Sequence, residues 1–107
     1  MKYYYLKNGK IKATDNIIVA GLMFEHQDRR IDLTQVGEMQ VSTVFLGINH
    51  NFDPDGPPIL FETMVFPGNF CVRAKTMGEA KRNHWKIVEA LRTDIDLESL
   101  DFSKEIQ

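Results

Sequence analysis

The middle of the chain, residues 41–72, contains three acidic side chains and neither lysine nor arginine. Two segments that lie largely inside it, at 39–48 and 59–66, are rich in β-branched and aromatic residues, as strands usually are. Glycine and proline come before and after the second segment, as expected where a strand ends in a turn. An apolar stretch of this length is stable only when buried, so the sequence predicts a sheet at the centre of the fold.

Shorter β-prone segments are expected on both sides of these two strands. Asn8-Gly9 readily takes the positive φ angles of a tight turn, which predicts an N-terminal hairpin with strands at 3–6 and 10–13. Similar composition predicts a short edge strand at 29–33 and another strand at 70–74. Together these segments favour an antiparallel sheet built from the hairpin and the central strands.

A first helix is expected between the hairpin and the edge strand. Thr14 or Asp15 would cap it, because either side chain can accept the unpaired amides of the first turn, and it would run to about His26. Its run 17–24 is apolar on every side, so such a helix is either deeply buried or covered by another subunit. A strand fits the same eight residues by periodicity alone.

A second, clearer helix begins after Thr76, which with Glu79 forms a capping box. Apolar residues and one histidine recur at three- and four-residue steps, which places them on one face toward the sheet: Met77, Ala80, His84, Ile87, Val88 and Leu91. The acidic residues 93–107 are predicted to form a loosely packed tail or a short helical turn. The sequence therefore predicts one α+β domain over residues 1–107, with both helices packed on the sheet.

The charges limit the possible partners of this domain. Lys and Arg total 13 and Asp and Glu total 15, a net charge of −2 that argues against a general nucleic-acid binder. No apolar run approaches the roughly 20 residues of a membrane span, and no signal peptide is recognisable. The single cysteine, Cys71, suits a reducing compartment, so a cytoplasmic protein is expected. Small size and the apolar 17–24 segment favour a homo-oligomer.

Glu62 is the polar residue that most needs an explanation. The segment 59–66 is apolar on both alternating faces, so it is predicted to be a central strand covered on both sides. A carboxylate buried there needs a proton or a cation. The possible partners are His50 in the long loop, Arg73 on the following strand and His84 in the helix.

Two interpretations of these residues remain open. In the first, Glu62 and one of its partners form a structural ion pair that fixes strand register. In the second, a ligand-binding pocket forms where five side chains converge, namely His50, Glu62, Thr63, Arg73 and His84.

Metal binding receives less support from the sequence. No HExxH or CxxC spacing is present, and no metal or other cofactor is expected. Asn51, Asp53, Asp55, Gly56 and Glu62 follow the spacing of a calcium loop. The predicted strands on either side and the pair Pro57-Pro58 are atypical of one.

Several motifs follow one another in a fixed order: Val-Ser-Thr-Val-Phe-Leu-Gly at 41–47, His50 and Phe52, Gly-Pro-Pro at 56–58, and Leu-Phe-Glu-Thr-Met-Val-Phe at 60–66. Over roughly residues 29–90 this pattern resembles a family of small proteins encoded by tailed bacteriophages and prophages. The resemblance extends to an Arg, a Thr, a Glu-Ala pair and a His, matched here by Arg73, Thr76, Glu79-Ala80 and His84. It implies a phage setting and assigns no activity.

Two segments depart from the pattern of that family. Its members commonly have a glycine-rich loop where this chain has Asp53-Pro54-Asp55. They also tend to have a more polar first helix than 17–24, so a subunit contact through this helix would be particular to this chain.

The resemblance and the predicted pocket together suggest a function. We expect an accessory protein in the host cytoplasm that binds a small host-derived ligand or a host protein, with a possible role in counter-defence. Whether it catalyses a reaction is left open by the sequence, which favours a protein without catalysis and assigns no catalytic residue. The alternatives are a small hydrolase or lyase that uses His50 and His84 with Glu62, and a structural or regulatory subunit.

Overall fold

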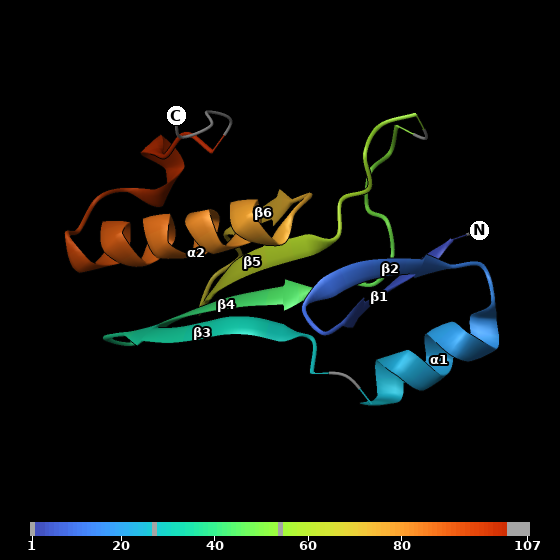
Figure 1. The fold of residues 1–107 in the computed structure, drawn as a ribbon. Coiled ribbons are helices and arrows are strands. Elements are labelled where there is room, and N and C mark those ends of the chain that lie inside the picture. Colours follow the sequence, from blue (N-terminus) through green and yellow to red (C-terminus); the bar gives the residue numbers. More distant parts are fainter. Residues whose placement is uncertain (1, 27, 54, 103–107) are drawn as a thin grey trace.

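The computed structural model describes residues 2–26, 28–53 and 55–102. Its elements, in order, are β1 (Tyr3–Lys7), β2 (Lys10–Thr14), α1 (Ile17–His26), β3 (Arg30–Val36), β4 (Met39–Phe45), β5 (Phe61–Phe66), β6 (Cys71–Ala74), α2 (Met77–Arg92) and the short 3-10 helix η1 (Leu97–Ser99). All strands pair antiparallel, in the orders β1-β2 and β3-β4-β5-β6. Helix α2 lies across one face of the four-stranded sheet (Figure 1). The α+β prediction is confirmed.

The N-terminal hairpin forms as predicted. Asn8 and Gly9 take φ angles of 53° and 76° at its turn. It makes a sheet of its own, however, rather than joining the central strands. A hydrogen bond of 2.9 Å from the Tyr4 amide to the Gly47 carbonyl links it to the segment that follows β4.

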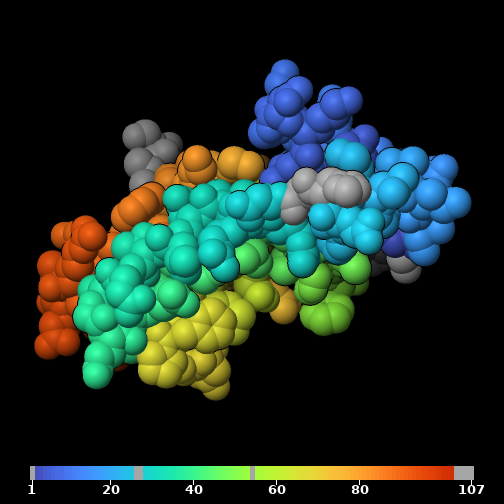
Figure 2. Space-filling view, turned by 90° about the horizontal axis from the view of Figure 1, so that it is seen from below, coloured from blue at the N-terminus to red at the C-terminus, as the bar shows by residue number. Residues whose placement is uncertain are grey.

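The apolar segment 17–24 is helical, so its strand alternative is wrong. Asn16 caps α1 in place of Thr14 or Asp15, because its Oδ1 accepts the amides of Ile18 and Val19 at 2.9 and 3.3 Å. Among the helices and strands, α1 contacts β1 and β2 alone. The hairpin and α1 lie at one end of the elongated molecule, opposite the C-terminal segment (Figure 2), and Tyr4 and Leu6 of the hairpin pack against the core of the four-stranded sheet.

Strand β5 lies inside the four-stranded sheet, as predicted, with β4 and β6 on either side. Phe61, Thr63 and Val65 point toward α2 and are buried. The intervening residues Glu62 and Met64 point to the opposite face, which no described helix covers. The prediction that both faces are covered is therefore wrong, and we call this second face the open face.

Two groups of apolar side chains form the core between α2 and the sheet. One is centred on Phe45 and Phe61, whose rings meet edge to face at 5.4 Å. The other contains Ile87 and Val88 of α2 and their partners on β4 and β5. Three side chains of the acidic segment pack against this second group, namely Leu97, Leu100 and Phe102. Of the two predicted forms of this segment, the short helical turn is present as η1, and the segment is tied to the core as far as Phe102 rather than loose. Residues 103–107 lie outside the described part of the chain.

Candidate functional site

His84 lies on the buried face of α2, where it is 0% exposed. Its Nε2 is 2.9 Å from Thr34 Oγ1 and its Nδ1 is 2.8 Å from Thr43 Oγ1. Thr43 Oγ1 is in turn 2.6 Å from Thr63 Oγ1. Three strands thus each supply one threonine to a polar network beneath α2. We call these four residues the His84 network.

Burial is the main influence on the ionisation of His84. It lowers the pKa of the imidazole below the ordinary 6.5, and the negative charge of Asp32 acts more weakly in the opposite direction. In neutral histidine one ring nitrogen donates and the other accepts, so both hydroxyl contacts can be satisfied without a charge. Since both nitrogens are engaged and the ring is inaccessible to solvent, this arrangement holds the helix on the sheet and offers no acid or base to a substrate.

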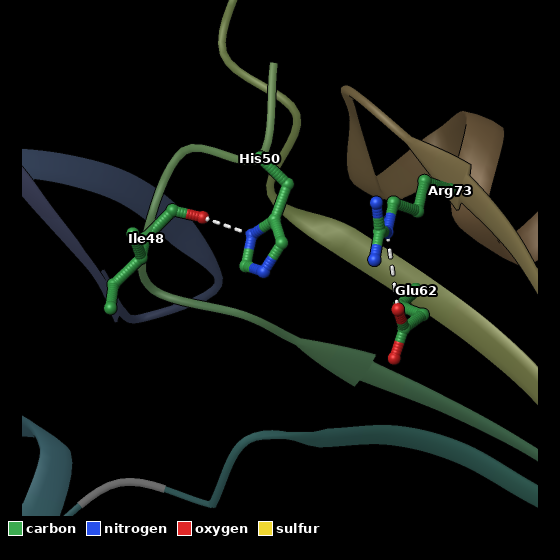
Figure 3. A network of polar contacts seen from close by, with 4 residues as sticks. All are labelled: Ile48, His50, Glu62 and Arg73. Atoms are coloured by element: carbon green, nitrogen blue, oxygen red, sulfur yellow. Dashed lines mark hydrogen bonds and ion pairs between the residues drawn. The ribbon is translucent and has the colours of Figure 1, made fainter. Parts of the chain in front are cut away.

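Glu62 and Arg73 form an ion pair on the open face. They are register partners on β5 and β6, and Arg73 Nε lies 3.1 Å from Glu62 Oε2 (Figure 3). The Glu62 side chain is 16% exposed, so it is partly shielded rather than enclosed in the core. The structure therefore supplies the structural ion pair that the first interpretation expected, with Arg73 as the partner.

Cys71 lies next to this pair on β6 and is exposed. Partial desolvation and, after it, the hydrogen-bonded carboxylate of Glu62 raise the pKa of the thiol to about 11. The thiolate form is the nucleophile, so at neutral pH this cysteine is nearly all in the unreactive form.

His50 lies in the loop after β4. Its Nδ1–H donates to the Ile48 carbonyl at 2.8 Å, and in Figure 3 no interaction joins the ring to Glu62 or Arg73. The loop backbone is fixed on this side by a 3.0 Å hydrogen bond from the His50 amide to the Ile59 carbonyl.

The five residues of the predicted pocket therefore lie in three places. Thr63 and His84 are under α2, Glu62 and Arg73 are on the open face, and His50 is in the loop. The alternation of a strand separates Glu62 from Thr63, since neighbouring side chains point to opposite faces. The sheet itself stands between His84 and the carboxylate of Glu62, and His50 is held in the loop by its bond to Ile48.

Two members of the His84 network, Thr34 and Thr43, are not among the predicted site residues. Thr34 was overlooked because the edge strand was predicted to end at residue 33, whereas β3 continues to Val36. Thr43 was not singled out as a site residue, yet its alternation with the buried residues Val41 and Phe45 would have placed it on the covered face.

The loop between β4 and β5 projects from the sheet (Figure 1) and is internally hydrogen-bonded. Asn49 Oδ1 accepts the amides of Asn51 and Ile59 at 2.8 and 2.9 Å. Asn51 Nδ2 donates to the Pro57 carbonyl at 2.7 Å, and its amide packs where a Cβ on Gly56 would come within 2.5 Å. Asn51, the first position of the calcium-loop spacing, thus hydrogen-bonds to the loop backbone.

Phe52 in this loop has 98% of its surface exposed. The amide of Asp53, its neighbour, donates to Asn51 Oδ1 at 2.9 Å, and the amide of Asp55 donates to Asp53 Oδ1 at 3.0 Å. An aromatic ring is thus presented on a braced backbone between polar and acidic neighbours. Single exposed apolar residues are common on proteins, but Phe52 is far more exposed than the other large apolar side chains of the described residues, of which Ile18 comes next at 70%.

A second apolar surface lies at the α1 end of the molecule. A pocket of about 180 Å³ opens between α1 and the start of β1, lined by Tyr3, Tyr4, Phe24 and Ile48 and by the helix residues Ile17 and Gly21. The ring of Phe24 packs directly on Gly47, where a Cβ would lie 2.1 Å from it.

Other kinds of site find little support in the described residues. Within 2–26, 28–53 and 55–102, no three His, Cys, Asp or Glu side chains are grouped as a metal ion would require. No helix in this part of the chain is long and apolar enough to cross a membrane.

Comparison with protein-family models, curated proteins and solved structures finds no match to this chain.

Proposed function

We propose that this chain is a non-enzymatic accessory protein of a tailed phage that binds a host protein in the host cytoplasm. The single observation that carries the proposal is Phe52, an aromatic side chain 98% exposed on a hydrogen-bonded loop. The phage setting rests on the resemblance of the central motifs. A counter-defence role is one use that such binding could serve.

The energetics of binding favour this loop as the contact. Aromatic side chains are frequent among the few residues that dominate binding energy, because they bury much area with few rotatable bonds. The loop is already braced by Asn49 and Asn51, so little conformational entropy is lost when a partner orders it. Phe52 has no packing role in the fold that would otherwise explain it.

Charge indicates the chemistry of the partner. Asp53 and Asp55 follow Phe52, and residues 41–72 contain no lysine or arginine. The complementary surface is an apolar pocket large enough for a phenyl ring, with basic side chains on its rim. We therefore favour a protein over a small-molecule ligand as the bound species.

The same geometry argues against a small-ligand site at the predicted pocket and against the hydrolase or lyase alternative. A ligand site built from His50, Glu62 and His84 would have to span both faces of the sheet. Acid–base catalysis by the two histidines would need an accessible His84, which is fully buried.

Capture from host lysate followed by affinity measurement tests the proposal. Immobilised wild-type protein and Phe52→Ala would be compared, partners retained by the first and lost by the second would be identified by mass spectrometry, and binding would be measured with the purified partner. Phe52→Ala should weaken binding by about 30-fold or more, as expected for a dominant contact. Phe66→Ala, which removes a half-exposed ring on the open face, is the matched control and should bind normally.

Equal capture by wild type and Phe52→Ala would refute the role of the loop. Because the ring touches almost nothing in the fold, its removal should leave the melting temperature unchanged. Loss of binding by Phe52→Ala could then not be attributed to unfolding.

A further inference from the structure

The pocket between α1 and β1, which we call the α1 pocket, is built on the core of the domain. It has a volume of about 180 Å³ and is lined almost only by apolar atoms. Tyr4 on one wall packs against the core group of Phe45, and its amide donates to the Gly47 carbonyl at 2.9 Å. From the helix side, the Phe24 ring packs on Gly47. The walls are thus tied to the four-stranded sheet, so the hollow exists before any ligand arrives.

A second recess borders the α1 pocket and has a different chemistry. It has a volume of about 490 Å³ and is lined by Phe24, Asp28, Arg29, Arg30 and Val44. The Phe24 ring belongs to both linings, so the two hollows are neighbours. Two guanidinium groups against one carboxylate give this recess a net positive charge.

The two arginines of the recess have donors to spare. The Arg29 guanidinium lies over the Phe24 ring, 4.5 Å from its centroid. Within residues 2–26, 28–53 and 55–102, neither arginine side chain takes part in an ion pair or a hydrogen bond. Asp28 is partly occupied, because its Oδ1 accepts the Arg30 amide at 3.0 Å. Each guanidinium carries five N–H donors in a fixed plane, an arrangement that suits carboxylate and phosphate oxygens.

The backbone holds both arginines in place. The Arg29 carbonyl accepts the Phe45 amide at 2.7 Å, and Arg30 begins β3 as the register partner of Val44. A ligand that binds here therefore has to order only the two side chains, which limits the entropy lost on binding.

We infer that the α1 pocket and the charged recess form one binding site for a small amphiphilic anion. Its apolar ring or short chain would occupy the pocket, and its carboxylate or phosphate would bind Arg29 and Arg30. An apolar cavity of about 150 Å³ is enough to bind benzene, so the α1 pocket accepts a group of that size. Apolar hollows with a few convergent polar groups are typical of small-molecule sites. The site does not include Phe52, so this inference is independent of the proposed binding of a host protein.

An anion is favoured over a neutral apolar molecule by the energetics of the recess. Hydrogen bonds between a guanidinium and an anionic oxygen are about twice as strong as those between neutral groups. A neutral ligand of the same shape would fill the pocket and leave the arginines in water. The charged head thus adds affinity and fixes the orientation of the ligand.

Phenylbutyrate and phenylbutanol separate the two parts of the site, because they share the apolar group and differ in the charged head. Calorimetry would measure their affinities for the full chain. The carboxylate should bind about tenfold more tightly or better, as expected for one charge-assisted hydrogen bond. Phenethyl phosphate should also bind more tightly than phenylbutanol, and the tighter of the two anions identifies the preferred head group. Amide NMR shifts of Gly21, Gly47 and Arg30 should all change on binding.

Gly21→Leu tests the α1 pocket. Gly21 lines the pocket, and a Cβ there would meet nothing within 4 Å, so leucine should fill the hollow without a clash. Leucine is also the better helix former, so the variant should keep its circular dichroism. Binding of both phenylbutyrate and phenylbutanol should be lost. Leu22→Ala is the matched control, because the neighbouring Leu22 is 52% exposed and does not line the pocket.

Arg29→Gln and Arg30→Gln test the charged recess. Each should weaken phenylbutyrate about tenfold and change phenylbutanol by less than about twofold, because only the anion uses the guanidinium. Lys75→Gln removes one exposed positive charge before α2, away from the site, and should bind phenylbutyrate like wild type.

Three results would overturn the inference. One is wild-type protein that binds no phenylbutyrate at millimolar concentration, and another is Gly21→Leu that binds it normally. The third is equal affinity for phenylbutyrate and phenylbutanol, or arginine variants no weaker than Lys75→Gln, since the recess would then not recognise the anion. None of these results bears on Phe52, whose variant is tested by partner binding.

Discussion

Acidification should destabilise this protein through His84 before most carboxylates titrate. Burial lowers the pKa of the folded imidazole below 6.5, whereas the unfolded chain takes up its proton near that value. Between the two pKa values the unfolded state binds more protons, so the free energy of unfolding decreases as the pH falls. This contribution is fully present above pH 6.5 and is lost as the pH falls from there toward the folded pKa.

The size of the effect has an upper limit. If the folded imidazole stays neutral, linkage gives a loss of about 1.4 kcal/mol by about pH 5.5, growing by about 1.4 kcal/mol for each further unit. The loss stops growing below the folded pKa, which the carboxylate of Asp32 raises somewhat against the effect of burial.

Urea unfolding at a series of pH values would measure this loss. The comparison is between wild type and His84→Gln, which keeps a polar amide under α2 but does not titrate. His50→Gln serves as the control, because it removes a histidine that lies outside the core. The wild type and His50→Gln should lose stability between about pH 7 and pH 5.5, and His84→Gln should lose less by about 1 kcal/mol. Identical pH dependence in all three proteins would refute the argument that His84 is held neutral.

Two further predictions concern the two faces of the sheet. Thr43→Val leaves His84 Nδ1 and the Thr63 hydroxyl without their shared partner, so the free energy of unfolding should fall by about 2–4 kcal/mol in urea titrations, against less than about 1 kcal/mol for Ser42→Ala on the open face. Equal decreases in the free energy of unfolding for Thr43→Val and Ser42→Ala would contradict the stabilising role of the His84 network. Cys71 should react slowly with iodoacetamide at neutral pH because its pKa is about 11, and Glu62→Gln should speed the reaction by removing a group that raises this pKa. An unchanged alkylation rate in Glu62→Gln would contradict the assigned contact.

Local signals in the sequence were sufficient for most of the elements. Asn8-Gly9 marked the hairpin, and Thr76 with Glu79 marked the start of α2, where the Glu79 amide donates to Thr76 Oγ1 at 3.1 Å. The Asn-Gly turn and the capping box each involve residues close together in the chain, so they can be recognised from the sequence alone. Ends of strands are set by pairing with distant segments, which is why β3 was predicted too short.

The candidate site could be predicted only in part. The pair of Glu62 and Arg73 was among the expected partners, and it follows from the register of β5 and β6. Which face of the sheet α2 would cover is decided by packing across the whole domain. Without that knowledge, Glu62 and Thr63 were placed in one pocket although they are neighbours on one strand.

The polar residues of the central motifs have structural roles in the fold. Among the polar residues of the central motifs, Thr43, Thr63 and His84 have partners that hold α2 on the sheet, and Glu62 is held by Arg73. The motifs that carry the phage resemblance are thus largely accounted for by the architecture. Side chains without such a role are Phe52, which is one of the motif residues and precedes the loop positions where this chain departs from the resemblance, and the exposed residues of α1, which belong to the other departing segment. Binding surfaces commonly vary on a retained scaffold, so specificity particular to this chain is expected at the loop and at α1 rather than beneath α2.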